Sequence, residues 1–155
     1  MGVCWQVMCR TPNPDQQLLH AFANGAPPCA IDSNPLAKLL GTTLIELNRD
    51  ARTVRLGFAP TSGLLQGAGV VQGGLVCAML DFAMAFATLA CLEEGDAAAT
   101  ANLNVSYLRA VRDENLLATG SIDHLGKKLA FARAELLAAN GTLLATANST
   151  LAIFR

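Results

Sequence analysis

A single carboxylate stands in the middle of a long apolar run, and a pair of glycines precedes the run. Asp81 is the only acidic residue between Arg55 and Glu93, and the two glycines are Gly73 and Gly74. Burying a carboxylate without a partner costs several kcal/mol. A carboxylate kept at that cost suggests acid–base or nucleophilic chemistry, so Asp81 is the first candidate for a catalytic residue.

The apolar run predicts a helix from Leu75 to Leu92, because Ala, Leu and Met favour helices and the run contains no Pro or Gly. The first backbone N–H groups of a helix have no partner within it and lie at the positive end of its dipole, which suits a bound anion or a developing oxyanion. Asp81 follows Gly74 by seven residues, about two turns, and therefore projects from nearly the same face. The alternative is a core helix whose carboxylate caps a neighbouring group or pairs with an arginine.

The stretch from Val70 to Leu92 is long enough to cross a bilayer. Against this, an Asp near the centre costs about 2.5 to 3.5 kcal/mol on insertion, and no cluster of Lys or Arg flanks either end. We therefore expect a soluble, globular protein that is not embedded in a membrane.

The composition fits one domain that associates with further copies of itself. Of 155 residues, 52% are hydrophobic and only 15% are charged, so part of the apolar surface is expected to be buried between subunits. We expect at least a homodimer, and two such dimers are expected to form a tetramer. The formal net charge of −1 gives no electrostatic reason to bind nucleic acid or an anionic membrane.

The cysteines and histidines form no recognisable site in the sequence. Five cysteines are an odd number, and none has the spacing of a Cys-x-x-Cys pair or a metal site, so we expect reduced thiols in a cytoplasmic protein. Cys77 and Cys91 fall within the predicted helix and are expected to be core thiols. His20 and His124 have no neighbours that complete a triad. The first ten residues lack the pattern of a signal peptide, and Gln6 stands where a myristoylation motif has Ser or Thr.

The rest of the chain predicts an antiparallel sheet. Short helices are expected near 15–23 and 35–41, a glycine-rich loop at 60–71, and strands at 42–48, 53–58, 100–108, 116–122, 129–136 and 142–154. Asn140-Gly141 is a strong hairpin signal. We expect an N-terminal arm over residues 1–34 and one α+β domain over 35–155, in which the sheet wraps around a long central helix buried on both sides.

The stretch from Gln66 to Asp81 resembles the motif of the hotdog-fold acyl-CoA thioesterases, most closely their phenylacetyl-CoA thioesterase-like branch. The pattern has Asn or Gln, then His-Gly-Gly starting six residues further on, then an acid eight residues after the first Gly. Gln66, Gly73, Gly74 and Asp81 match it at that spacing. Gln72 replaces the His, so a hydrogen bond donated by the His would come from an amide, and no proton could be exchanged there.

The resemblance implies a hotdog fold and a site shared between subunits. Asp81 would act as nucleophile or general base on the thioester carbonyl, and the Gly73 N–H would stabilise the oxyanion. Gln66 would orient the thioester or the attacking water, with Gln72 in the place of the His and Thr100 near the position of a family hydroxyl residue. Asp81 is expected from one subunit, and Gln66 with Gly73 from the other.

The resemblance also implies a CoA ester as substrate, without a metal or redox cofactor. Lys127 and Lys128 form the only pair of adjacent lysines, at a turn beside the strand expected to border the site, and are candidates to bind the CoA phosphates. Arg109 and Arg112 are alternatives, and Gly74 is expected to contact the substrate. An ordinary solvated turn is the other interpretation of the two lysines.

The leading hypothesis is therefore an enzyme that hydrolyses a medium-chain or aryl acyl-CoA to free acid and CoA. Apolar residues that could line an acyl pocket are Leu65, Phe82, Met84 and Phe86. One alternative is a hotdog acyl-CoA hydratase or dehydratase, which would use His with Asp or Glu and is disfavoured by Gln72. The other alternative is a non-catalytic acyl-CoA-binding protein.

Overall fold

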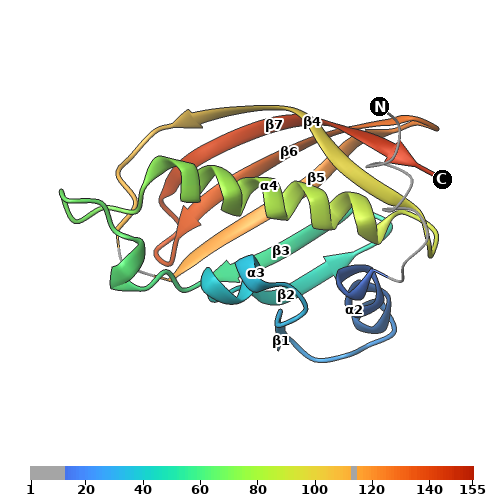
Figure 1. Cartoon of the computed structure of the whole chain (residues 1–155), viewed down its shortest axis with the longest axis horizontal. Coiled ribbons are helices and arrows are strands. Elements are labelled where there is room, and N and C mark those ends of the chain that lie inside the picture. The colour runs from blue at the N-terminus through green and yellow to red at the C-terminus, as the bar shows by residue number, and fades with distance from the viewer. Residues whose placement is uncertain (1–12, 113–114) are drawn as a thin grey trace.

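The computed structural model describes residues 13–112 and 115–155 (Figure 1). Its helices are α2 (Pro14–Ala23), α3 (Pro35–Leu39), the short 3-10 helix η1 (Ser62–Leu64) and α4 (Gly73–Ala90). Its strands are β1 (Cys29–Ala30), β2 (Thr43–Asn48), β3 (Thr53–Phe58), β4 (Ala97–Tyr107), β5 (Leu116–Leu125), β6 (Leu129–Ala138) and β7 (Leu143–Phe154). The interpretation of the first ten residues as lacking a signal peptide or a lipid-attachment motif lies outside the described residues.

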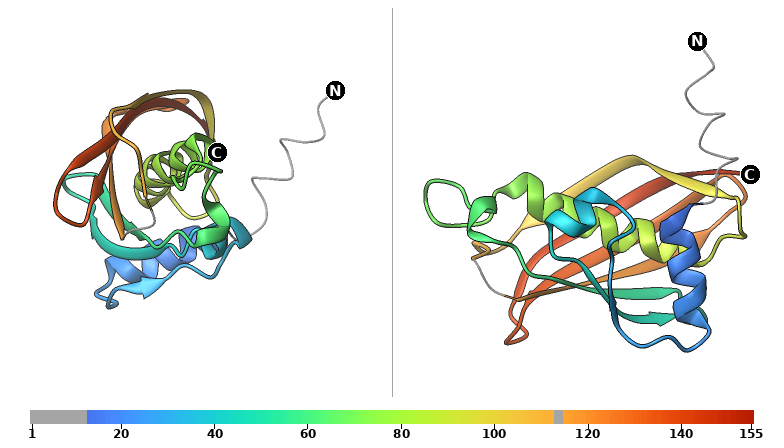
Figure 2. Two further views of the ribbon diagram at one scale, coloured as in Figure 1. Left: turned by 90° about the vertical axis from the view of Figure 1, so that its left-hand side faces the viewer. Right: turned by 60° about the horizontal axis from the view of Figure 1, so that its bottom comes forward.

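One antiparallel sheet of seven strands curves around α4, as the two views of Figure 2 show. The strand order is β1-β2-β3-β5-β6-β7-β4. The predicted architecture, an antiparallel sheet wrapped around one long helix, is confirmed. The hairpin at Asn140-Gly141 is also confirmed: Gly141 has a φ of 83°, and the Thr142 N–H donates to Asn140 Oδ1 at 2.9 Å.

Strand β4 occupies one end of the sheet. It precedes β5 in the sequence, but it pairs with β7 instead, from Ala97 opposite Phe154 to Tyr107 opposite Ala145. Its other edge pairs with none of the described strands. A register shift between Thr100 and Asn102 interrupts the alternation of faces along the strand.

The helix α4 lies close against β5. A Cβ added to Gly120 would lie 2.0 Å from the carbonyl oxygen of Ala83, so only glycine allows this approach. The contact fixes the distance between the helix and the sheet at Ala83, two residues after Asp81. It therefore positions the carboxylate as well as the core.

One face of α4 is left partly uncovered by residues 13–112 and 115–155. Leu75, Ala78, Phe82 and Ala85 recur at helical spacing, and each is only partly buried. The expectation that the helix is buried on both sides is therefore wrong for a single chain. α4 is the one described helix long and apolar enough to cross a membrane, yet 56% of it is buried within the fold, as is typical of a core helix.

The N-terminal segment packs against the far end of α4. Asn13 caps α2 by accepting a hydrogen bond from the Asp15 N–H at 3.0 Å, and Leu19 is fully buried. Gln16 is 1% exposed; its Nε2 donates to the Glu93 carbonyl at 2.8 Å, and its Oε1 accepts from the Gly95 N–H at 3.3 Å. These bonds tie α2 to the loop that follows α4. The two-residue strand β1 was not predicted, because so short a strand has no periodicity to detect.

Candidate active site at the start of the central helix

The first turn of α4 is capped by the side chain of Gln72. This residue has the extended backbone of an N-cap, and its Oε1 accepts a hydrogen bond from the Gly74 N–H at 2.6 Å. A Cβ on Gly74 would lie 2.8 Å from that oxygen, so the short contact depends on glycine. The amide that stands in place of the family's His therefore organises the helix start with its carbonyl oxygen. Its NH₂ group donates to no described residue and remains available to a substrate.

A tyrosine that the sequence analysis did not consider holds the same peptide unit from its other side. Tyr107 Oη donates to the Gly73 carbonyl at 2.9 Å, and its ring lies 3.6 Å from where a Gly73 Cβ would be. Partial burial, and then the neighbouring Cys77, raise the pKa of the Tyr107 hydroxyl, which keeps it a donor near neutral pH. The Gly73–Gly74 peptide is thus held at its C=O by Tyr107 and at its N–H by Gln72.

The Gly73 N–H itself donates to no acceptor among the described residues. It is the first N–H of the helix, where the dipole favours negative charge. Because the next peptide unit is fixed by two side chains, this N–H points in a defined direction. The structure therefore provides a preorganised donor where the motif predicts an oxyanion site.

The fold brings Asp81 of α4 and Thr100 of β4 together, a contact that the sequence analysis did not predict. Thr100 Oγ1, on β4, donates to Asp81 Oδ1 at 2.7 Å. Asp81 is only partly buried, so the expectation of a buried carboxylate without a partner is wrong. The other carboxylate oxygen accepts no hydrogen bond from a described residue, and it is free to act on a water or a carbonyl carbon.

Within one chain, Asp81 and Gly73 do not form a single site. They are eight residues apart on one helix, which separates them by about 12 Å along its axis. A reacting carbonyl must lie roughly 3 Å from both its oxyanion donor and its attacking group. One chain therefore carries two halves of a site rather than a complete one.

Gln66 lies at the Gly73 end of the molecule, away from Asp81. Leu65 and Val71 form a small bridge, and the turn between them is closed by hydrogen bonds of 2.8 Å between Gln66 and Val70 and between Gly69 and Gln66. The Gln66 side chain is exposed. The structure places it on the loop that leads into α4, beyond the half of the site that contains Gly73.

The candidate phosphate-binding residues are separated by the fold. Arg109 and Tyr107 line a cavity of about 320 Å³ beside Gly73, and Arg109 Nη1 donates to the Leu143 carbonyl at 2.6 Å. Lys127 and Lys128 follow β5, whose last residue lies with the C-terminal end of α4. In a single chain, Arg109 therefore lies at the same end of α4 as the Gly73 N–H, and the two lysines lie at the other end.

The candidate acyl-pocket residues and Cys77 differ in burial and reactivity. Met84 and Phe86 are buried in the core, whereas Leu65 and Phe82 are only partly buried. Burial, and then the charge of Asp81, raise the pKa of the Cys77 thiol, which disfavours a nucleophilic thiolate. Across residues 13–112 and 115–155, no group of three or more His, Cys, Asp or Glu side chains is arranged to hold a metal ion.

Known proteins share both the sequence and the shape of this domain. A family model described as the thioesterase superfamily matches residues 68–145. A candidate esterase from Mycobacterium tuberculosis strain H37Rv is 31% identical over 97 residues, which are 61% of this chain and 68% of that protein. The chain belongs to the thioesterase superfamily.

Two solved structures resemble this chain. A candidate thioesterase from Ralstonia eutropha JMP134, related to phenylacetic acid degradation, is 30% identical with a TM-score of 0.76, covering 86% of this chain and 98% of its own. The Escherichia coli PaaI protein of the phenylacetic acid degradation operon is 19% identical with a TM-score of 0.74, covering 94% and 97%. The second likeness shows the fold alone.

The predicted hotdog fold of the PaaI-like branch and the predicted enzyme class, a thioester hydrolase, are both confirmed. The stretch matched by the superfamily includes the two glycines, Asp81 and Thr100, whereas Gln66 lies just outside it. The residues that form the two half-sites therefore belong to the shared part of the thioesterase.

Proposed function

We propose that this thioesterase hydrolyses an acyl-CoA to a free acid and CoA at a site completed by a second copy of the chain. The observation that carries the proposal is the pair of half-sites on α4. A free Gly73 N–H marks one, and a carboxylate held by Thr100 marks the other, about 12 Å apart. Each lacks what the other supplies.

The uncovered surfaces of the chain support such a dimer. Strand β4 has 11 residues and an unpaired outer edge, which proteins normally cover. Next to it runs the partly buried apolar stripe of α4, formed by Leu75, Ala78, Phe82 and Ala85. A two-fold partner that continued the sheet through its own β4 would cover both features. The two α4 helices would then run antiparallel, with Asp81 of one copy facing Gly73 of the other.

The chemistry follows from these groups. Asp81 acts on the thioester carbonyl carbon, either directly as a nucleophile or by taking a proton from an attacking water. The carbonyl oxygen becomes negative and is stabilised by the Gly73 N–H, with the free amide of Gln72 nearby. The C–S bond then breaks, and the CoA thiolate leaves and is protonated. Attack by water gives the free acid directly, whereas attack by Asp81 gives an acyl anhydride on the carboxylate that a water then hydrolyses to the acid. No step calls for a redox cofactor.

The substrate is proposed to be a medium-chain or aryl acyl-CoA in the cytoplasm. The partly buried Phe82 and the apolar stripe of α4 would face the acyl group across the interface. Arg109, beside Gly73, would meet a CoA phosphate. Two such dimers would form a tetramer.

The test is the release of free thiol from a panel of short, medium, long and aromatic acyl-CoAs by the wild type and by Asp81→Asn. We expect turnover in the variant to fall by about 10² to 10⁴-fold, because an amide can neither attack nor accept a proton. The matched control is Asp123→Asn. It removes an exposed carboxylate of β5 that pairs with Arg133 of β6, and it should leave turnover unchanged. Both variants should retain the wild-type thermal midpoint to within a few degrees.

Other outcomes would identify the alternatives. Wild-type protein that binds acyl-CoA but releases no thiol would be a binding protein. Gain or loss of an acyl double bond without thiol release would indicate a hydratase or dehydratase. Undiminished hydrolysis by Asp81→Asn would remove Asp81 from the mechanism.

A further inference from the structure

A cavity lies at the opposite end of α4 from Gly73. It has a volume of about 530 Å³, within the range of small-molecule sites. We call it the arginine cavity. Four separate segments form its walls: α2, the β2–β3 turn, the end of α4 with its following loop, and the end of β5. The polar and charged residues that line it include His20, Arg49, Arg52, Cys91, Glu93 and Glu94.

The walls of the arginine cavity are held in place by buried contacts. Gln16 of α2 is 1% exposed and bonds to both Glu93 and Gly95 of the loop after α4. Leu19, next along α2, is fully buried in the core. The cavity is therefore formed by packed elements before any ligand arrives, which lowers the entropic cost of binding.

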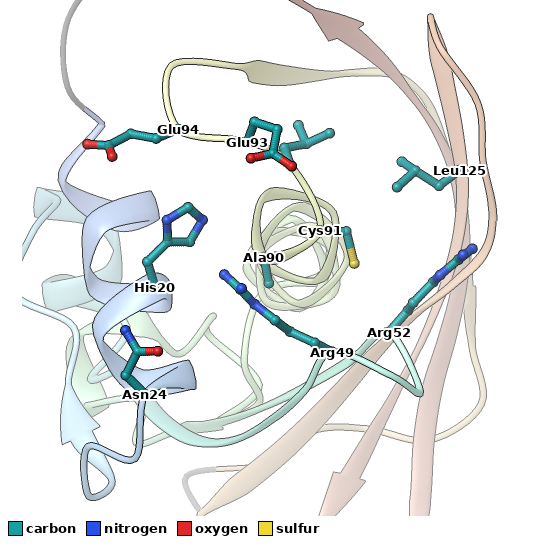
Figure 3. A pocket seen from close by; sticks show the side chains of 10 residues that line it. His20, Asn24, Arg49, Arg52, Ala90, Cys91, Glu93, Glu94 and Leu125 are labelled. Atoms are coloured by element: carbon teal, nitrogen blue, oxygen red, sulfur yellow. The ribbon is translucent and has the colours of Figure 1, made fainter.

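The arginines on its walls are unpaired. Figure 3 shows Arg49 and Arg52 leaving the β2–β3 turn in opposite directions, with Glu93 and Glu94 on the other side of the cavity. Neither guanidinium forms an ion pair or a side-chain hydrogen bond with a described residue. By contrast, Arg55, on the same hairpin, pairs with Glu46 at 3.7 Å. The two cavity arginines thus have donor groups free for a ligand.

Two further groups mark the same space. His20 Nε2 is covered from solvent and makes no hydrogen bond to a described group, which is costly for a buried polar nitrogen. Burial raises the pKa of the Cys91 thiol, and the charges of Arg52 and then Arg49 oppose that rise. Figure 3 shows the two guanidinium groups on either side of Cys91, with Arg49 directed toward His20 and Arg52 toward the side of Leu125.

The backbone at Arg52 adds an independent observation. Arg52 has a φ of 53°, and no other non-glycine residue among those described has a positive φ. That conformation favours glycine, so an arginine there is strained by roughly 1 kcal/mol or more. Strain that persists at a residue lining a cavity points to a use for its side chain.

We propose that the arginine cavity is a second binding site, separate from the hydrolytic one, for a small organic anion whose carboxylate or phosphate groups bind Arg49 on one side and Arg52 on the other. Planar guanidinium groups recognise both kinds of oxyanion through paired hydrogen bonds. His20 is placed to contact the remainder of the ligand. Arg49, Arg52 and His20 lie outside the stretch matched by the superfamily, whereas Cys91, Glu93 and Glu94 lie inside it.

The acidic residues determine where the anion lies. Glu93 and Glu94 would repel an oxyanion, so the anionic group is held on the side of the β2–β3 turn. Removing one of these charges should strengthen binding. This sign distinguishes an anion site from a patch of solvated charges, in which Glu93→Gln would have no effect on any ligand.

The experiment is a calorimetric titration of the full chain with inorganic phosphate and, separately, with succinate, so that the two oxyanion types are distinguished. We expect about one binding event per chain for at least one probe. Arg49→Gln and Arg52→Gly should each weaken it at least tenfold, and Glu93→Gln should tighten it. Arg52→Gly is chosen because glycine relieves the backbone, so lost binding cannot come from lost folding. Arg55→Gln, which removes the same charge from the same hairpin outside the cavity, is the control.

Two results would overturn the proposal. One is no binding of either probe in the millimolar range; the other is equal weakening by Arg55→Gln and the cavity variants, which would mean a diffuse effect of charge. Hydrolysis of a short thioester that lacks phosphates should stay at the wild-type rate in both arginine variants. Because that activity is measured separately, failure of this site leaves the proposed hydrolysis unaffected.

Discussion

The two ends of α4 are built in different ways. At the N-terminal end, Gln72, Gly73 and Gly74 are consecutive, and a single strand supplies Tyr107 as their support. At the C-terminal end, the arginine cavity draws its walls from four segments spread between His20 and Leu125. The first end presents a backbone donor in a small open cavity. The second presents side-chain charges in a larger one.

This difference indicates a division of roles along one helix. Positive helix ends stabilise negative charge through the backbone, so the N-terminal end needs few side chains. The C-terminal end of a helix repels anions, so a site for an anion there needs cationic side chains brought from elsewhere. Arg49 and Arg52 supply them from the β2–β3 turn. The chemistry and the second binding site can therefore be altered independently.

The strongest way to break this comparison is to delete the backbone donor itself. Gly73→Pro removes the N–H at the first helical position, where proline is favoured, and the extended backbone of Gln72 is compatible with a following proline. We expect kcat to fall by about 10² to 10³-fold, the usual effect of losing one oxyanion donor. The thermal midpoint should stay close to that of the wild type.

Gly73→Ala is the matched control for this variant. It retains the N–H, and its Cβ would stand 3.6 Å from the Tyr107 ring, an ordinary contact. The alanine variant should therefore keep most of its activity. Equal losses in the alanine and proline variants would show that added bulk, and not the donor, accounts for the effect.

The end of α4 that carries the chemistry could be predicted from the sequence, because its residues are contiguous. The spacing of Gly73, Gly74 and Asp81 was enough to place a donor and a carboxylate on one helix. The burial of Asp81 was predicted wrongly, since an apolar run does not reveal that one face of the helix is left for a partner. Only the structure shows that face as a stripe of partly buried residues.

Tyr107 and the arginine cavity could not be predicted, for two physical reasons. Thr100 and Tyr107 are an odd number of residues apart, so strict alternation puts them on opposite faces of β4. The register shift after Thr100 brings both toward α4. The cavity depends on long-range contacts, such as Gln16 with the loop after α4, that no local pattern encodes.

A smaller effect distinguishes the two ends by their cations. Arg109→Ala should raise KM for acyl-CoA about tenfold, because Arg109 lies beside Gly73 and a lost phosphate contact is worth roughly 1 to 2 kcal/mol. The rate with a thioester that lacks the nucleotide should be unchanged. Lys127→Ala combined with Lys128→Ala should have the smaller effect on KM, since this turn lies at the other end of α4. A larger change in KM for the lysine variant would mean that Lys127 and Lys128 of one subunit contact the CoA bound at the Gly73 end of a second subunit.

The smallest expected effect tests whether Tyr107 acts through Gly73. Tyr107→Phe keeps the ring against Gly73 and removes only the hydroxyl that donates to its carbonyl. Loss of one such hydrogen bond is worth about 0.5 to 1.5 kcal/mol, so kcat should fall roughly 2- to 12-fold while KM stays the same. A structural role alone would lower the thermal midpoint and spare kcat. The deciding measurement is the same substitution in the Gly73→Pro background, where no donor is left to orient. There, Tyr107→Phe should change kcat by less than about twofold, whereas a full additional loss would show that the hydroxyl acts independently of the Gly73 N–H.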